Sequence, residues 1–138
     1  MKLAYIDSCV WIAWIEGLPE YKKIIGQAMQ TLAEAGWIYC LSEAIMLEVL
    51  ANPLRLQNTA LVDIYRRLFA QCRHLTTPTT VFRDALAVAT TENLKGMDAV
   101  HVAIAERQGC QCLVSTDSHF ARLKMLTPHW IQLSTPSP

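Results

Sequence analysis

The chain has 138 residues, of which 52% are hydrophobic and 17% charged, so it is long enough to bury a core as one domain. Twelve basic and twelve acidic residues give a formal net charge of zero, which excludes the strongly basic composition of many nucleic-acid-binding proteins. No apolar stretch approaches the roughly 18 residues that a membrane-spanning helix needs. The N-terminal apolar run is interrupted at Asp7, so we expect a cytoplasmic protein without a signal peptide.

Five cysteines are present, an odd number, and most of them lie in apolar runs. The Cys-Gln-Cys sequence at 110–112 lacks the two-residue spacing of a zinc knuckle, and no second pair accompanies it. We therefore expect buried free thiols in a reducing compartment.

The N-terminal third predicts two strands and two helices. The apolar segment 3–6 is a strand that ends at Asp7. The run CVWIAWI at 9–15 has no polar face, which is typical of a helix that is deeply buried or pressed against another chain. A second helix over 19–35 begins with proline and ends before a glycine. The strand predicted at 37–41 is apolar throughout, as in parallel sheets.

The next predicted helix contains two glutamates. Ser42 is its expected N-cap, and Glu43 lies in the first turn, where the helix dipole favours a negative charge. Glu48 lies among apolar neighbours, and two interpretations stay open: a site residue, or a solvent-facing residue of an amphipathic helix. Pro53 is expected to break the chain before an amphipathic helix over 58–71.

A weak strand at 74–76 and a helix opened by Thr-Pro at 77–78 come next. This helix contains Asp84, whose sequence DALAVA resembles the DAVHVA that begins at Asp98. Asp84 lies a turn into its helix with no glycine before it, so we interpret it as a surface or capping charge. Asp98 is the better candidate for a functional site.

The stretch from Lys95 to Phe120 organises the chain. A turn at Gly96 begins a helix over 97–108, and the strand 112–114 follows a second glycine. Asp117 comes just after this strand, in a turn that leads into another helix. The remaining predicted segments are a strand at 130–133 and a disordered tail at 134–138.

Strands alternate with helices over the whole length. This pattern predicts an α/β three-layer sandwich with a mostly parallel central sheet of about five strands, in a single domain over 1–133. Open parallel sheets bind ligands at the carboxyl ends of their strands. Asp7 and Asp117 follow strands and Asp98 begins a helix, so we expect them to meet at one rim of the sheet.

Four carboxylates, those of Asp7, Glu48, Asp98 and Asp117, would then be crowded together. Like charges so close cannot all be ionised without a counter-charge, so either some of these acids are protonated or a hard divalent cation lies among them. Oxygen ligands without histidine or cysteine favour Mg²⁺ or Mn²⁺ over zinc. Such ions bind phosphate oxygens and lower the pKa of a bound water. The sequence has no Gly-rich phosphate loop and no serine and histidine at a telling spacing. It therefore favours metal-dependent phosphoryl chemistry.

Three segments together resemble the PIN domain, a nuclease family that includes VapC-type toxins of toxin–antitoxin pairs. They are YIDSCVWI, SEAIMLEVLANPLR and MDAVHVAIAERQGCQCLVSTDSHF, and the resemblance covers nearly the whole chain. It implies that a metal is held by the four acids Asp7, Glu48, Asp98 and Asp117. It also implies that Ser8 and Ser115 support these carboxylates by hydrogen bonding. Some relatives carry a further acid two positions past the last aspartate; His119 stands there, which argues against a tightly held second metal.

The resemblance implies an endoribonuclease that uses Mg²⁺ or Mn²⁺, with Glu48 as a metal ligand or as the group that orients the nucleophile. The candidate phosphate contacts, each of which could also be a solvated surface charge, are Arg55, Arg122 and Lys124. One alternative is a Mg²⁺-dependent phosphohydrolase of another α/β family, although Cys9 stands where those enzymes commonly place a second acid. Another is a catalytically silent PIN-like module that binds protein or RNA.

The apolar runs at 9–15 and 61–69 are candidate partner surfaces. The resemblance implies a homodimer that binds a small antitoxin, whose C-terminal segment brings a basic side chain to the acidic rim. At least one tryptophan of 9–15 is expected near the surface unless another element covers it. The simplest alternative is that the helix after Pro19 covers this run.

Overall fold

The structure is a computed structural model that describes residues 1–133. Over this range five strands form one parallel sheet in the order β3-β2-β1-β4-β5. The strands are β1 (Lys2–Ile6), β2 (Trp37–Ser42), β3 (Arg73–Leu75), β4 (Cys112–Ser115) and β5 (Thr127–Trp130). The helices are α1 (Ser8–Glu16), α2 (Pro19–Glu34), α3 (Glu43–Arg55), α4 (Thr59–Phe69), α5 (Val81–Glu92) and α6 (Gly96–Arg107), with a short 3₁₀ turn η1 (Ser118–Phe120).

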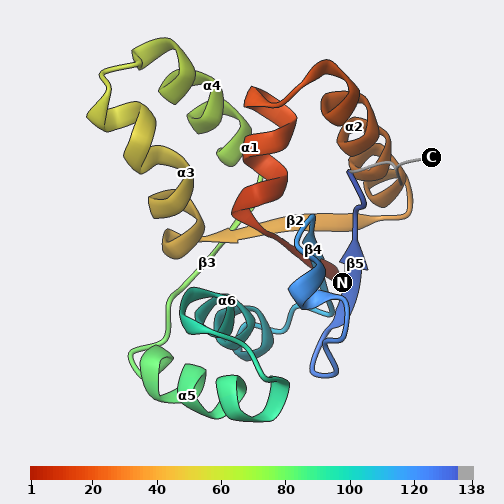
Figure 1. Ribbon diagram of the computed structural model, residues 1–138, viewed down its shortest axis with the longest axis vertical. Helices are drawn as coiled ribbons and strands as arrows, with labels where there is room; N and C mark the ends of the chain where they lie inside the picture. The colour runs from red at the N-terminus through yellow and green to blue at the C-terminus, as the bar shows by residue number, and fades with distance from the viewer. Residues whose placement is uncertain (134–138) are drawn as a thin grey trace, which may run out of the picture.

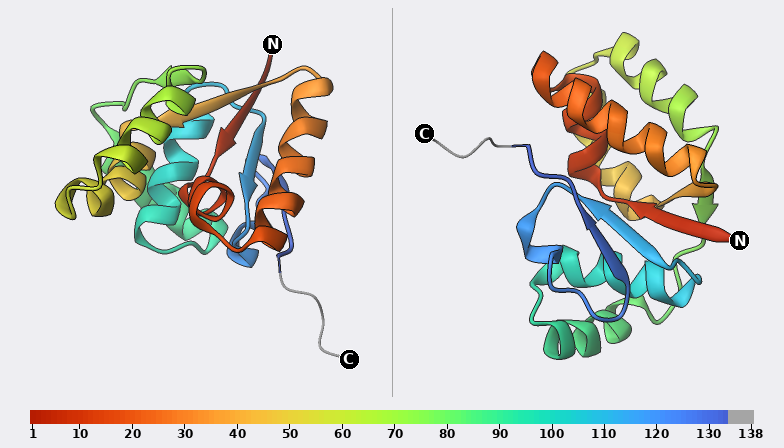
Figure 2. Two further views of the ribbon diagram at one scale, coloured as in Figure 1. Left: turned by 90° about the horizontal axis from the view of Figure 1, so that it is seen from above. Right: turned by 90° about the vertical axis from the view of Figure 1, so that its right-hand side faces the viewer.

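Helices cover both faces of the sheet. Helices α1 to α4 lie on one face and α5 and α6 on the other (Figures 1 and 2). The predicted α/β three-layer sandwich is therefore confirmed, and every strand pair in the described part of the chain is parallel.

Strand β1 lies at the centre of the sheet, where it pairs with β2 on one side and β4 on the other. The chain first builds β2 and β3 outward from β1, then crosses over to place β4 and β5 on the opposite side. The loops after β1 and β4 thus lead away from a topological switch point, where open α/β sheets bind ligands. Asp7 and Asp117 follow these two strands.

The helix boundaries have local causes that the sequence carries. Pro19 is the first residue of α2, and the Ser42 side chain caps α3 by accepting the N–H of Ile45. Gly36 and Gly109 adopt positive φ angles of 90° and 82° just after α2 and α6. Glycine adopts this left-handed conformation without a steric penalty, which explains why both helices end there.

Helix α6 is buried along most of its length. The seven consecutive residues 99–105 are all buried, since α6 packs against α5 and lies beneath the sheet (Figure 1). His101 is the one polar side chain in this run and is 1% exposed. A buried polar side chain needs hydrogen-bond partners, so its surroundings bear on function.

Helix α1, which lacks a polar face, is covered largely by this chain itself. Trp11 is 1% exposed, stacks on Trp14 at 6.0 Å and meets Phe69 of α4 edge-on at 5.3 Å. Trp14 is partly buried and packs beside Gly26 of α2, where an added Cβ would lie 3.6 Å from its Nε1 atom. Helices α2 and α4 therefore cover both tryptophans of this run, and Trp11 is a core residue, whereas Ile12 stays 37% exposed.

Three predicted boundaries were wrong. The helix expected to open at Thr77-Pro78 begins only at Val81, with Thr80 at the N-cap position. Pro53 does not break the chain, because its ring lies buried in the last turn of α3, which continues to Arg55. The last strand is Thr127–Trp130, in register with Cys112–Ser115, and not 130–133. Pro128 is tolerated there because β5 is an edge strand, where a missing N–H costs no ladder hydrogen bond.

Three further sequence expectations can be placed. The helix expected after Asp117 is only the 3₁₀ turn η1. All five cysteines are free thiols, and three of them are buried. None of the helices described is both long enough and apolar enough to cross a membrane. The tail predicted at 134–138 lies outside the described residues.

Candidate metal centre

Asp7 is fixed by hydrogen bonds to both carboxylate oxygens. It ends β1, is 7% exposed, and its Oδ1 atom accepts the backbone N–H of Ser8 at 2.8 Å. Its Oδ2 atom accepts the hydroxyl of Ser115 at 2.8 Å. Ser115 ends β4 and is 1% exposed, so this hydrogen bond joins the ends of the two central strands. The Ser115 hydroxyl also accepts the N–H of Asp117 at 3.0 Å.

The thiol of Cys9 lies against the same carboxylate. Its Sγ atom is 3.4 Å from Oδ2 of Asp7 and 3.3 Å from the hydroxyl of Ser115, and it accepts the N–H of Thr116 at 3.4 Å. Burial, followed by the charge of Asp7, raises the pKa of this thiol. Cys9 is therefore a protonated packing residue that donates to Asp7.

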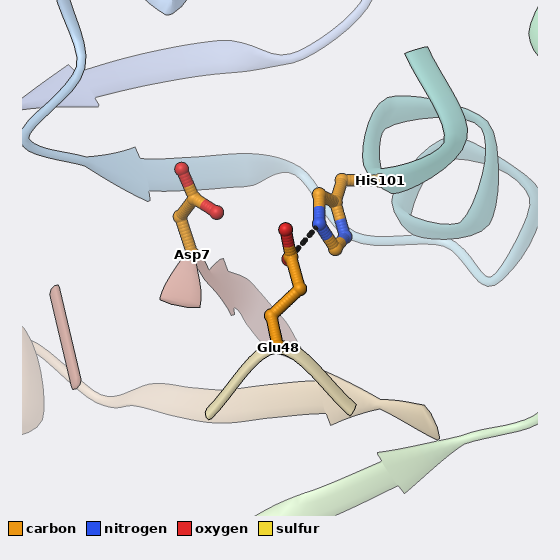
Figure 3. Close-up of side chains that lie close together, drawn as sticks. All are labelled: Asp7, Glu48 and His101. Atoms are coloured by element: carbon orange, nitrogen blue, oxygen red, sulfur yellow. Dashed lines mark hydrogen bonds and ion pairs between the residues drawn. The ribbon is translucent and has the colours of Figure 1, made fainter. Parts of the chain in front are cut away.

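Glu48 reaches the rim from the first half of α3. Figure 3 shows its carboxylate between Asp7 and His101, and Nε2 of His101 lies 2.5 Å from Oε1 of Glu48. The hydrogen bond from His101 is the main cause that lowers the pKa of Glu48, against an opposing effect of burial. Glu48 is therefore a carboxylate at neutral pH, held by a histidine from the opposite face of the sheet.

Asp98 lies in the first turn of α6. Its pKa is raised, first by desolvation and then by the negative charges of Asp117 and Asp7. This dependence places the three aspartates in one electrostatic neighbourhood, although they come from positions far apart in the sequence. A positive ion among them would relieve the repulsion.

Asp117 caps the 3₁₀ turn η1 and accepts the N–H of His119 at 2.9 Å. The Nδ1 atom of His119 lies 3.1 Å from Oδ1 of the same aspartate, and its side chain is 75% exposed. Position 119, which was compared above with an acid of some PIN-domain proteins, therefore has an imidazole beside the carboxylate of Asp117.

These side chains form two adjacent groups with the composition of a divalent-cation site. The ligand atoms of Asp7, Glu48 and His101 lie within 4.8 Å of one another, and so do those of Asp98, Asp117 and His119. Carboxylate oxygens predominate, which suits Mg²⁺ or Mn²⁺. The residues present therefore fit a hard divalent cation, and the repulsion that raises the pKa of Asp98 supports this fit.

A pocket of about 880 Å³ opens beside Asp98. Three cationic side chains line it beside His119, against the two acids Glu92 and Asp98; the three are Lys95, Arg122 and Lys124. A basic pocket that adjoins an acidic cluster can bind a phosphate chain and present one phosphate to the acids.

The other charged residues singled out in the sequence lie elsewhere. Arg55 is seven residues beyond Glu48 on α3, about 10 Å along the helix axis, and donates to Oδ1 of Asn52. It does not line the pocket beside Asp98. Asp84 lies in the first turn of α5, accepts the hydroxyl of Thr80 at 2.8 Å, and belongs to neither acidic group.

Sequence reasoning missed the two histidines and Lys95. We expected carboxylates only, yet each acidic group has a histidine beside it, and Nε2 of His101 is engaged by the carboxylate of Glu48. The signal for His101 was present, because a histidine inside the apolar run AVHVAIA must find a partner if the helix is buried. No comparable sequence pattern pointed to Lys95, whose place in the pocket wall is seen only in the structure.

The fold and the acidic rim together define a doubly wound α/β protein with a carboxylate cluster at its topological switch point. The PIN domain family matches residues 4–126. The chain therefore belongs to the PIN domain family, as its motifs suggested. This membership removes the phosphohydrolase of another α/β family as an alternative. Comparison with curated protein sequences gave no match.

Several solved structures share the fold. DNA-bound VapBC from Salmonella typhimurium has a TM-score of 0.75 at 13% identity and covers 96% of this chain and 100% of that one. VapBC2 from Rickettsia felis, bound to a promoter DNA fragment, has a TM-score of 0.73 at 13% identity, over 94% and 99% of the two chains. VapC20 from Mycobacterium tuberculosis, a sarcin–ricin loop cleaving toxin, has a TM-score of 0.59 at 18% identity, over 91% and 99%. At these identities the similarity establishes the fold.

Proposed function

We propose that this protein is a metal-dependent endoribonuclease that hydrolyses RNA phosphodiester bonds. The observation that carries the proposal is the convergence of Asp7, Glu48, Asp98 and Asp117 on one rim of a PIN fold. Three of these acids share one electrostatic neighbourhood, in which the pKa of Asp98 is raised. A cluster of this kind has a cost for the empty protein that is relieved when a cation binds.

In this proposal different residues bind the cation, position its ligands and orient the attacking water. Asp7, Asp98 and Asp117 hold the cation, and the hydrogen bonds from Ser8 and Ser115 keep Asp7 in place. A bound Mg²⁺ or Mn²⁺ would polarise the scissile phosphate and lower the pKa of the attacking water. Glu48, ionised at neutral pH, orients that water or contributes a further ligand.

The basic pocket supports a polyanionic substrate. Lys95, Arg122 and Lys124 line it next to Asp98, so a phosphate chain bound there would lead directly to the acidic rim. The RNA preference rests on the family, because no residue contact selects ribose over deoxyribose. Arg55 stays a weaker candidate for a phosphate contact, since it lies about 10 Å along α3 from Glu48.

We further propose that the protein is the toxin of a toxin–antitoxin pair and forms a homodimer in the cytoplasm. A similar fold occurs in a toxin–antitoxin complex from Klebsiella pneumoniae, with a TM-score of 0.68 at 18% identity. The five free thiols suit a reducing compartment. Exposed apolar side chains on and next to α3 and α4 offer a partner surface; they are Leu47, Leu54, Leu56 and Ile64, 45% to 65% exposed. A basic antitoxin side chain would then complement the acidic rim.

The decisive experiment is cleavage of a structured RNA and of a DNA of the same sequence with Mg²⁺, with Mn²⁺ and with EDTA. We expect cleavage of RNA alone, with either metal, and none with EDTA. RNA binding without cleavage under all conditions would identify a catalytically silent PIN-like module. Cleavage that persists in EDTA would contradict a metal mechanism.

A further inference from the structure

A chain of buried hydrogen bonds leads from the sheet to Glu48. The hydroxyl of Tyr5 on β1 lies 2.7 Å from Oγ of Ser42 and 2.8 Å from Nδ1 of His101. The other ring nitrogen of His101, Nε2, lies 2.5 Å from Oε1 of Glu48. Ser42, Tyr5 and His101 are each at most 1% exposed, so water does not compete for these groups.

The direction of each hydrogen bond follows from counting donors. Within residues 1–133 the hydroxyl of Ser42 contacts only Tyr5 and the N–H of Ile45, which donates to it. The hydrogen of the Ser42 hydroxyl must therefore point to the oxygen of Tyr5. Tyr5 is then left to donate its own hydrogen to Nδ1 of His101.

This direction decides the state of the imidazole. Because Nδ1 of His101 accepts from Tyr5, it carries no proton. The proton of a neutral imidazole is then on Nε2, from which it donates to the carboxylate of Glu48. One arrangement satisfies all four side chains: Ser42, Tyr5 and His101 each donate toward the acidic rim, and the carboxylate of Glu48 accepts the last of these hydrogen bonds.

We propose that His101 is a positioning residue for Glu48, and that Ser42 and Tyr5 lock its imidazole as the Nε2–H tautomer, so that the carboxylate stays beside Asp7. This inference rests on the proposed function, because it gives Glu48 its place in that site. His101 does this work from α6, which also carries Asp98. The same helix thus supplies one acid directly and fixes another from the opposite face of the sheet.

Tyr5→Phe tests the inference because it removes one hydroxyl and leaves the ring. The matched control is Tyr39→Phe, which removes a hydroxyl that donates to the carbonyl of Met29, away from the rim. We expect metal-free wild type and Tyr39→Phe to show ¹⁵N shifts of an Nε2–H imidazole at His101. In Tyr5→Phe we expect a mixture of tautomers and about tenfold weaker Mn²⁺ binding by calorimetry, within the range known for partners of metal ligands.

A second pair of variants separates positioning from packing. His101→Gln keeps an N–H that can donate to Glu48, whereas His101→Leu does not. We expect His101→Gln to retain more Mn²⁺ affinity and more kcat than His101→Leu, even where the two melt at the same temperature. Equal loss in both variants would contradict the positioning role.

Two results would overturn the inference directly. One is an Nδ1–H tautomer or an imidazolium at His101 in wild type at neutral pH. The other is a Tyr5→Phe variant that matches Tyr39→Phe in both tautomer and Mn²⁺ affinity. Wild type that neither binds Mn²⁺ nor cuts RNA would instead refute the proposed function, and the tautomers in metal-free protein would then decide the positioning inference alone.

Discussion

Asp98 contributes charge repulsion to the folded protein, because desolvation, Asp117 and Asp7 all raise its pKa. Asp98→Asn keeps the size of the side chain and removes the charge. We expect RNA cleavage to fall at least about 100-fold, and the melting temperature of the metal-free protein to rise by a few degrees at pH 7. About 1 kcal/mol corresponds to roughly 4 °C in a domain of this size. Cleavage assays and thermal melts in EDTA measure the two effects.

The pH dependence of this stability difference has a fixed sign. A carboxyl group with a raised pKa binds its proton more tightly in the folded state, so wild type loses stability as the pH rises through that pKa. The advantage of Asp98→Asn should therefore be full at pH 7 and shrink as the pH falls toward 4. Asp84→Asn, with its acid outside both groups, should leave cleavage unchanged. Wild-type cleavage by Asp98→Asn would show that the site is misplaced.

At the scale of residues, sequence reasoning reached the acids more easily than their partners. Asp7 and Asp117 follow strands, and parallel strands have common ends, so their meeting could be predicted. His101 could not be assigned to Glu48, because the two lie on different elements with no spacing rule between them. Only the fold brings them together: Glu48 comes from α3 on one face of the sheet, His101 comes from α6 on the other, and their Oε1 and Nε2 atoms lie 2.5 Å apart.

The loop before β5 is tied to α5 by one side chain. The carboxylate of Glu92 accepts the backbone N–H groups of Lys124 and Met125, the latter at 2.7 Å. This loop also carries Arg122, and Glu92 itself lines the same pocket, so its carboxylate fixes the loop that supplies part of the cationic wall. We expect Glu92→Ala to raise KM for RNA about tenfold, equivalent to roughly 1.4 kcal/mol, and to leave kcat largely unchanged. Steady-state kinetics on a short RNA would measure both constants.

Glu34→Ala is the matched control for this prediction, since Glu34 accepts from Gln30 on α2 and does not line the pocket. It should change neither constant. A loss of kcat with constant KM in Glu92→Ala would contradict a role for this loop in substrate binding.

The elements themselves were largely predictable, and the errors have physical causes. Pro19 marked the start of α2, and Gly36 and Gly109 marked the ends of α2 and α6. These boundaries could be predicted because such signals act locally. Pro53 was misjudged because proline is unfavourable inside a helix, yet burial in the last turn compensates the lost hydrogen bond. The last strand was misplaced because its position depends on register with β4, which no local pattern specifies.

At the scale of the whole molecule, a cation that relieves the repulsion among these acids should make the stability of the folded protein depend on metal binding. We expect Mn²⁺ to raise the melting temperature of wild type, because an ion that binds only the folded state stabilises it by mass action. At 100 times the dissociation constant the gain is about 2.7 kcal/mol. Thermal melts with and without millimolar Mn²⁺ test this, and Asp98→Asn should respond less. An unchanged melt in wild type would count against a carboxylate metal centre.

The exposed apolar side chains on and next to α3 and α4 should drive self-association. Leu54 is 49% exposed and lies in a pocket of about 520 Å³ between these helices. We expect analytical ultracentrifugation to show a wild-type dimer and a monomeric Leu54→Glu variant, since a buried charge without a partner opposes an apolar contact. Leu18→Glu changes an equally exposed leucine outside this surface and should stay dimeric.

A strictly monomeric wild type would contradict this prediction. Helix α1, which contains the other candidate partner surface in the sequence, is unsuitable for such a test. Trp11 is buried against Phe69, so its removal would destabilise the fold and confuse the two effects.

At the centre of the sheet, two strands that are far apart in the sequence pair with each other. Ala4, Tyr5 and Ile6 pair with Cys112, Leu113 and Val114, and the hydrogen bond from Ser115 to Asp7 spans 108 positions. Contacts between such distant positions form late in folding. During synthesis, Asp7 emerges first but meets Ser115 and Asp117 only after β4 has been made. A nascent chain that stops before β4 therefore has no assembled acidic rim, and the proposed activity requires synthesis to continue through Asp117.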